Sequence, residues 1–180
     1  GQVVRNEERR RGDSLNSNDD DRRLYFDDLS VGQKFVSGKH HLDEGQIKAF
    51  AQRFDPQPFH LDPDAAERSF FKELVASGWH TASITMKLLV EGGLPIAGGL
   101  IGAGGEMTWP RPTRPGAVLQ VESEVVALRP SRSRPDRCLA VIRSETRNQQ
   151  GEVVQILTAK IVVPRRPDVG AGTPAAPAIS

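Results

Sequence analysis

The sequence has little cysteine: Cys138 is the only one in 180 residues. A single cysteine excludes a disulfide within the chain and argues against a cysteine-based metal site. Cys138 stands in the run CLAVI, whose composition is typical of a strand. We therefore expect a packed small side chain rather than a nucleophile.

Long apolar runs and an excess of one charge are also missing. No stretch approaches the ~20 apolar residues of a membrane span, and the N-terminus lacks the apolar core of a signal peptide. The formal net charge is only +1, which does not favour a nucleic-acid partner. These absences predict a cytoplasmic protein with no membrane partner.

The two ends of the chain lack the apolar residues that a core needs. Residues 1–23 carry opposed blocks of charge and predict a disordered N-terminal tail. Residues 165–180 are rich in Pro, Ala and Gly and predict a disordered C-terminal tail. Residues 24–164 remain as one domain, long enough for a single hydrophobic core.

Periodic apolar residues predict three helices. The first covers residues 43–54, with Asp43 as N-cap and Gln46 in the capping-box position. A second short helix covers residues 62–71, capped by Asp62. The third, residues 79–90, is apolar over most of its circumference and is therefore expected in the middle of the fold.

The remaining segments alternate as strands do, and the turn NQQG joins the last two. A glycine-rich stretch, residues 92–105, lacks the Gly-Lys-Ser/Thr of a phosphate-binding loop and is expected to be a mobile lip of a substrate tunnel. One buried helix followed by an antiparallel meander indicates an α+β layer fold. The expected strands are residues 35–42, 106–109, 118–128, 137–148 and 152–163.

The stretch FDPQPFHLD places an acid and an imidazole five residues apart. Pro56 and Pro58 stop the preceding helix, so we expect Asp55 and His60 to lie on a stiff, non-helical segment. Taken alone, such a pair is more often a helix terminator and a turn histidine.

Three motifs in order resemble one family. FDPQPFHLD resembles the D-x-N-P-x-H-x-D signature of the MaoC-like dehydratases, which include the (R)-specific enoyl-CoA hydratases. ASGWHTASI is similar to that family's entry to its long helix, and WPRPTRPGAVLQVESEV to its R-P-V-x-P-G-D-x-L segment. The resemblance runs from about residue 25 to 163 and implies the hot-dog fold, a curved antiparallel sheet wrapped around a long central helix. Gln57 stands where most members have Asn, Phe54 where a Gly is usual, and Ser77 where His is frequent.

The resemblance implies a hydratase or dehydratase that adds or removes water across the 2,3 bond of an acyl-CoA thioester. Asp55 would be the leading base, with His60 orienting the water or sharing its proton. The N–H of Gly78, at a helix start, would bind the thioester oxygen, and the missing Cβ would let the thioester approach closely. No metal or redox cofactor is implied, and a homodimer is expected.

Other side chains are candidates for binding the substrate. Two arginine pairs are weaker candidates for CoA phosphates, with a solvated basic hairpin tip as the alternative. His80 is also open to interpretation as a core or interface histidine. The substrate-binding candidates are Ser77, Trp79, His80, Gln57 and Phe59, and the phosphate candidates are Arg111, Arg114, Arg132 and Arg134.

Two other functions stay open from the sequence. One is a hot-dog acyl-CoA thioesterase, and the other is a non-catalytic acyl-CoA-binding module. The unusual residues Phe54 and Gln57 leave the non-catalytic module open as an alternative.

Overall fold

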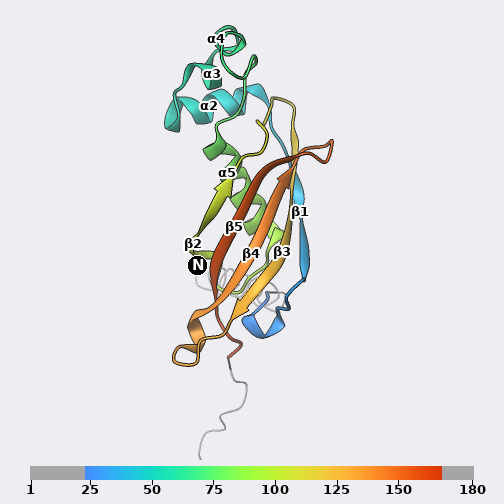
Figure 1. The fold of residues 1–180 in the computed structure, drawn as a ribbon, viewed down its shortest axis with the longest axis vertical. Helices are drawn as coiled ribbons and strands as arrows, with labels where there is room; N and C mark the ends of the chain where they lie inside the picture. Colours follow the sequence, from blue (N-terminus) through green and yellow to red (C-terminus); the bar gives the residue numbers. More distant parts are fainter. Residues whose placement is uncertain (1–22, 168–180) are drawn as a thin grey trace, which may run out of the picture.

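A computed structural model describes residues 23–167. The strands in this range form one five-stranded antiparallel sheet (Figure 1). The predicted tails therefore lie almost entirely outside the described residues. Across the sheet the strand order is β1-β3-β4-β5-β2, so β1 and β2 form its two edges. The strands are β1 (Lys34–His41), β2 (Ile101–Thr108), β3 (Val118–Arg129), β4 (Cys138–Arg147) and β5 (Val153–Val163).

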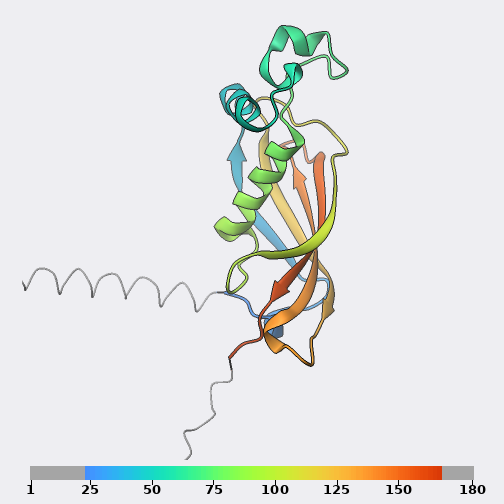
Figure 2. The same ribbon diagram turned by 90° about the vertical axis from the view of Figure 1, so that its left-hand side faces the viewer.

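The longest helical segment lies against the concave face of this sheet (Figure 2). It is α5 (Gly78–Leu88), which continues through the π-helical turn η2 (Leu89–Gly93). This is the predicted hot-dog arrangement, and the fold prediction is confirmed. Within the described part of the chain, no helix combines the length and apolar character needed to cross a bilayer. The other helical segments are η1 (Phe26–Asp28), α2 (Glu44–Phe54), α3 (Pro58–Leu61), α4 (Pro63–Glu67) and η3 (Pro135–Arg137).

The predicted caps start α2 and α4. The carboxylate of Asp43 accepts the backbone N–H of Gln46 at 2.8 Å, and that of Asp62 accepts the N–H of Asp64 at 3.0 Å. The Gln46 side chain does not complete a capping box, because it bonds His40 instead, at 2.8 Å. Helix α4 ends at Glu67, four residues short of the predicted end.

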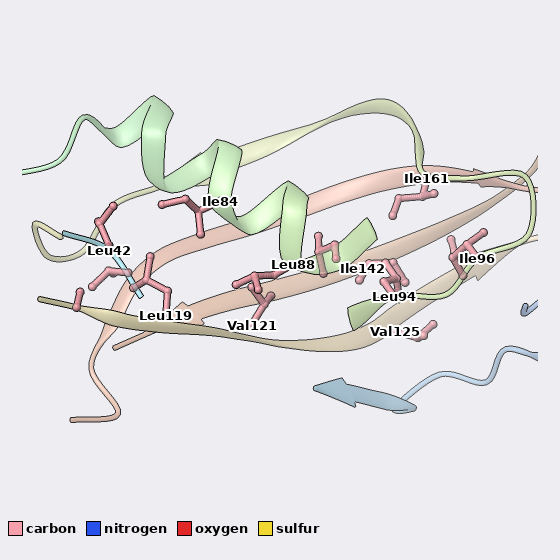
Figure 3. Packing of buried hydrophobic residues seen from close by; sticks show 14 of the residues in the cluster. Leu42, Ile84, Leu88, Leu94, Ile96, Leu119, Val121, Val125, Ile142 and Ile161 are labelled. Carbon is pink, nitrogen blue, oxygen red and sulfur yellow. The ribbon is translucent and has the colours of Figure 1, made fainter. Parts of the chain in front are cut away.

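The core lies between α5 and the sheet (Figure 3). Ile84 and Leu88 point from the helix towards Leu119 and Val121 of β3 and Ile142 of β4. Each such side chain contributes about 1.5–3 kcal/mol when fully buried. Alternate β3 residues are buried, which is the period-two pattern that predicted this strand.

We expected the helix over residues 79–90 to be buried on all sides, and this is wrong for one of its faces. Trp79, Met86 and Val90 are 62%, 45% and 60% exposed. The sheet covers only the helix face that carries Ile84 and Leu88. Apolar side chains therefore remain exposed on the opposite face of the helix.

The glycine-rich stretch is not a mobile lip as predicted. Residues from Ile101 onward form β2, which pairs with β5 along its length. A Cβ at Gly105 would lie 2.5 Å from the Thr158 carbonyl oxygen, so glycine there permits close strand pairing. Residues 101–105 were not predicted as a strand because glycine is usually depleted in strands.

The ends of the described chain are joined by two ion pairs. Arg165 contacts Asp27 and Arg166 contacts Asp28, each at 2.6 Å. Ordered contacts therefore continue at least to Arg166, slightly beyond the domain boundary expected from composition.

Candidate active site

Asp55 and His60 come from the end of one helix and the turn of the next. Asp55 ends α2, and its N–H bonds the Ala51 carbonyl at 2.9 Å. Gln57 is extended, as the residue before a proline must be, and Pro58 then starts α3. His60 therefore lies on a one-turn helix, so the prediction of non-helical backbone holds for Asp55 but is wrong for His60.

The two side chains face each other. His60 Nε2 lies 3.3 Å from Asp55 Oδ2, and His60 Nδ1 lies 2.6 Å from the Val75 carbonyl oxygen. A carbonyl only accepts, so Nδ1 carries a proton and donates it to Val75. Nε2 is thereby left as the nitrogen that can exchange a proton on the side of Asp55.

Two further groups hold Asp55. Gln57 Nε2 donates to Oδ1 at 2.7 Å, and the Ser77 hydroxyl also hydrogen-bonds the carboxylate. Burial alone would raise the pKa of Asp55, but the Ser77 and Gln57 hydrogen bonds and the neighbouring His60 bring it below its ordinary value. Asp55 is therefore ionised at neutral pH.

Ser77 connects this carboxylate to α5. It is the N-cap of that helix, and its hydroxyl oxygen accepts the Trp79 N–H at 3.2 Å. Because one hydroxyl both caps the helix and bonds Asp55, the start of α5 is fixed relative to the acid. Ser77 is thus a neighbour of the Asp55 carboxylate.

Gly78 is the first residue of α5, so its N–H has no acceptor within the helix. The sequence suggested that a missing Cβ makes room for a thioester. Instead, a Cβ at Gly78 would lie 2.7 Å from Cε2 of Trp109, so an indole fills that side. Glycine is required here because Trp109 packs directly against the helix start.

A cavity of about 480 Å³ opens beside the Asp55–His60 pair. Aromatic rings form much of its wall, and Phe59 and Phe71 lie in contact with ring centroids 5.2 Å apart. Six of the predicted catalytic or substrate-binding residues line it: Asp55, Gln57, Phe59, His60, Gly78 and Trp79.

Asp62, the last acid of the motif, plays a different part. It caps α4 and does not line the cavity. The two acids of FDPQPFHLD therefore divide into one beside the imidazole and one that starts a helix.

His80 lies on another face of α5, away from the predicted substrate tunnel. It lines a separate depression with His40, Lys87 and Phe50, and its ring stacks on Phe50 with centroids 4.5 Å apart. Its Nδ1 has no hydrogen-bond partner among the described residues. Burial, with a smaller effect of His40, lowers the pKa of His80 to about 4.

His80 should make the protein less stable in acid. Between pH 6.5 and 4 the unfolded chain binds a proton at this histidine that the folded chain does not, so stability falls as pH falls. Replacing His80 by Phe keeps a ring against Phe50 but removes the titration. We expect the loss in free energy of unfolding between pH 7 and 4.5 to shrink by about 2 kcal/mol, measured by urea unfolding. His41→Phe, at an exposed position, is the control; an equal effect there contradicts the assignment.

The predicted phosphate-binding arginines do not lie together in the structure. Arg111 lines the cavity but pairs with Glu152, and Arg114 pairs with Glu73 at 2.6 Å. Arg132 and Arg134 follow β3, whose 12 residues at ~3.3 Å each place them roughly 35 Å from the strand end near the cavity (Figure 1). These two are therefore remote from the Asp55–His60 pair.

Several cavity residues were missed from the sequence. Trp109 and Thr113 belong to the segment after β2, and Thr113 bonds Thr81 of α5 at 3.0 Å. Val75 acts through its carbonyl, for which side-chain identity gives no signal. The WPRPT run beginning at Trp109 was a usable signal, because its two prolines fix the backbone of a loop.

Within the described residues, no three His, Cys, Asp or Glu side chains are grouped to hold a metal ion. The arrangement is instead a carboxylate and an imidazole beside an aromatic cavity at the start of the central helix. It defines a hot-dog protein equipped for acid–base chemistry.

The chain belongs to the family described as "MaoC like domain", which matches residues 28–145. A crystal structure of a MaoC-like dehydratase from Rhodospirillum rubrum is 60% identical and has a TM-score of 0.79. That similarity covers 80% of this chain and 99% of the other. The predicted family is confirmed.

Two curated proteins are also similar. One, an uncharacterized protein YdeM from Bacillus subtilis, is 34% identical over 113 residues, or 61% of this chain and 79% of its own. A 3-hydroxybutyryl-CoA dehydratase from Methylorubrum extorquens is 31% identical over 113 residues, or 62% of this chain and 69% of its own.

Proposed function

We propose that this protein is a hydratase or dehydratase that adds or removes water across the 2,3 bond of an acyl-CoA thioester. The observation that carries the proposal is the 3.3 Å contact between Asp55 Oδ2 and His60 Nε2, with the other imidazole nitrogen committed to Val75. Membership of the MaoC-like family and the aromatic cavity beside the pair support it.

In hydration, the carboxylate of Asp55 takes a proton from water as the water oxygen bonds to C3 of the enoyl group. The double-bond electrons move towards the thioester, whose oxygen gains negative charge. The Asp55–His60 pair gives one proton to C2 after taking one from water, so it ends in its starting state. Dehydration follows the same steps in reverse.

The enolate oxygen needs a donor, and the Gly78 N–H is our candidate. It belongs to the first turn of α5, where the N–H groups lack helical acceptors and the helix dipole adds positive potential. Trp109 covers the Cβ side of Gly78, so the thioester must approach this N–H from the open cavity.

Crotonyl-CoA is the first substrate to test, because the Methylorubrum extorquens relative is named for the corresponding 3-hydroxybutyryl-CoA. Loss of enoyl-thioester absorbance without release of thiol supports the hydratase. Free CoA indicates instead the thioesterase, and binding without either change indicates a non-catalytic module. Mesaconyl-CoA and a longer enoyl-CoA extend the test to other acyl groups.

Gln57 should set the acid limit of this activity. Its amide is one of the groups that lower the pKa of Asp55, so Gln57→Leu raises that pKa. The base form is then lost at a higher pH as the solution is acidified. We expect the acidic limb of kcat/KM to move to higher pH, and Gln57→Asn to move it less if the shorter amide still reaches Asp55. An unchanged limb in Gln57→Leu contradicts this role.

We also propose a homodimer. Met86 of α5 and Val90 of η2 are 45% and 60% exposed on one face of the helix, and within the described residues β2 leaves one edge of the sheet unpaired. A second copy would cover both. Sedimentation equilibrium should give twice the chain mass, whereas a monomer at micromolar concentration contradicts the proposal.

A further inference from the structure

Gln155 is a buried polar residue that the proposed chemistry does not use. It lies on β5 with no exposed area, behind the wall of the cavity rather than on it. A buried amide costs free energy unless it is hydrogen-bonded, whereas an apolar side chain of similar size would not carry this cost. The hydrogen-bond partners of Gln155 therefore show what its amide does in the fold.

Its hydrogen bonds fix a single orientation of the amide. Trp109 Nε1 can only donate, so it lies 3.0 Å from the oxygen Oε1 of Gln155. Gln155 Nε2 donates to the Thr85 hydroxyl at 3.1 Å, and that hydroxyl donates to the Thr81 carbonyl at 2.9 Å. In the 2.6 Å contact between Thr85 and Thr146, Thr146 is then the donor. The chain of hydrogen bonds runs from the core of the sheet to the indole without conflict.

Trp109 is the end of this chain that reaches the cavity. Its side of the cavity is partly open, and the residue is 42% exposed, so burial alone leaves room for another rotamer. Its indole ring packs against Gly78, and it meets Trp79 nearly edge to face, with centroids 5.6 Å apart. The indole therefore stands between the cavity and the buried Gln155.

We propose that Gln155 is a positioning residue that holds Trp109 as a wall of the cavity, and that this wall limits the length of the acyl group accepted. The ligand class, an acyl-CoA thioester, rests on the proposed function. With the hydrogen bond removed, the indole can turn away from Gly78 and leave space over the start of α5. A longer acyl chain then fits.

The position of Trp109 can be followed directly. The chain has two tryptophans, so Trp79→Phe leaves Trp109 as the only indole. Adding Gln155→Leu should shift its emission to longer wavelength and increase quenching by acrylamide. Adding Thr146→Val instead breaks a neighbouring hydrogen bond of the same core and should leave Trp109 unchanged. An unchanged emission in Gln155→Leu overturns the positioning role.

Acyl length is tested by binding in the full chain. Calorimetry gives the Kd of butyryl-CoA and of octanoyl-CoA, saturated esters that cannot be hydrated. Gln155→Leu should shift the ratio of the two Kd values at least about tenfold towards octanoyl-CoA, while Thr146→Val keeps the wild-type ratio. Trp109→Phe, which deletes the N–H donor and reduces the ring, is the second variant and should shift the ratio in the same direction.

The outcomes separate this inference from the proposed function. An unchanged ratio in both Gln155→Leu and Trp109→Phe overturns the wall, whatever the turnover. A shifted ratio in a protein without hydratase activity supports the wall and contradicts the function. If the wild type binds neither ester, the function and the length limit both fail, and the emission of Trp109 still decides the role of Gln155.

Discussion

Replacing Asp55 by Asn is expected to lower kcat for crotonyl-CoA hydration by about a thousandfold. The amide has nearly the same shape and still accepts hydrogen bonds, so the contacts of Gln57 and Ser77 with this side chain can persist. It cannot take a proton from water at neutral pH. The measurement is initial-rate kinetics, with thermal unfolding to show that the fold is intact.

Asp62→Asn is the matched control. Asp62 lies in the same nine-residue motif but caps α4, and Asn is as good an N-cap as Asp. This variant should keep wild-type activity and stability. If Asp55→Asn retains full turnover, or Asp62→Asn loses as much, the assignment of the base is wrong.

His60→Asn is expected to lower kcat by about a hundredfold or more. The nitrogen of Asn can take the place of Nδ1 and still donate to the Val75 carbonyl, while Nε2 is removed. Stability should therefore stay close to that of the wild type. The loss should appear in kcat rather than in KM, because the missing group moves a proton in the transition state.

His60→Gln tests the other nitrogen. Its amide reaches towards Asp55 but leaves the buried Val75 carbonyl without its donor, at a cost of about 1–3 kcal/mol in stability. Activity is also expected to be lost, since an amide does not exchange protons at this pH. If His60→Asn is fully active, the histidine serves only to hold Val75.

Strong local patterns made much of the fold predictable. The apolar face with Ile84 and Leu88, and the alternation in β3, depend on burial that repeats with the period of each element. The hairpin turn at Gly151 was equally readable, since its φ of 76° suits glycine. The family motif also brought Asp55 and His60 together correctly, because its prolines constrain the chain between them.

The missed features depend on contacts between distant segments. Strand β2 is rich in glycine, and only its pairing with β5 shows why. His80 faces Phe50 instead of the cavity because helix rotation is set by packing, which one histidine does not reveal. The bond from Trp109 to Gln155 joins residues 46 positions apart, and neither residue alone indicates the other.

The most direct test is hydration of crotonyl-CoA in water labelled with ¹⁸O, followed by mass spectrometry of all products. We predict 3-hydroxybutyryl-CoA carrying one ¹⁸O atom, no free CoA, and loss of this product in Asp55→Asn. Label found in free crotonic acid, together with released CoA, would show thioester hydrolysis and contradict the proposed hydration of the 2,3 bond.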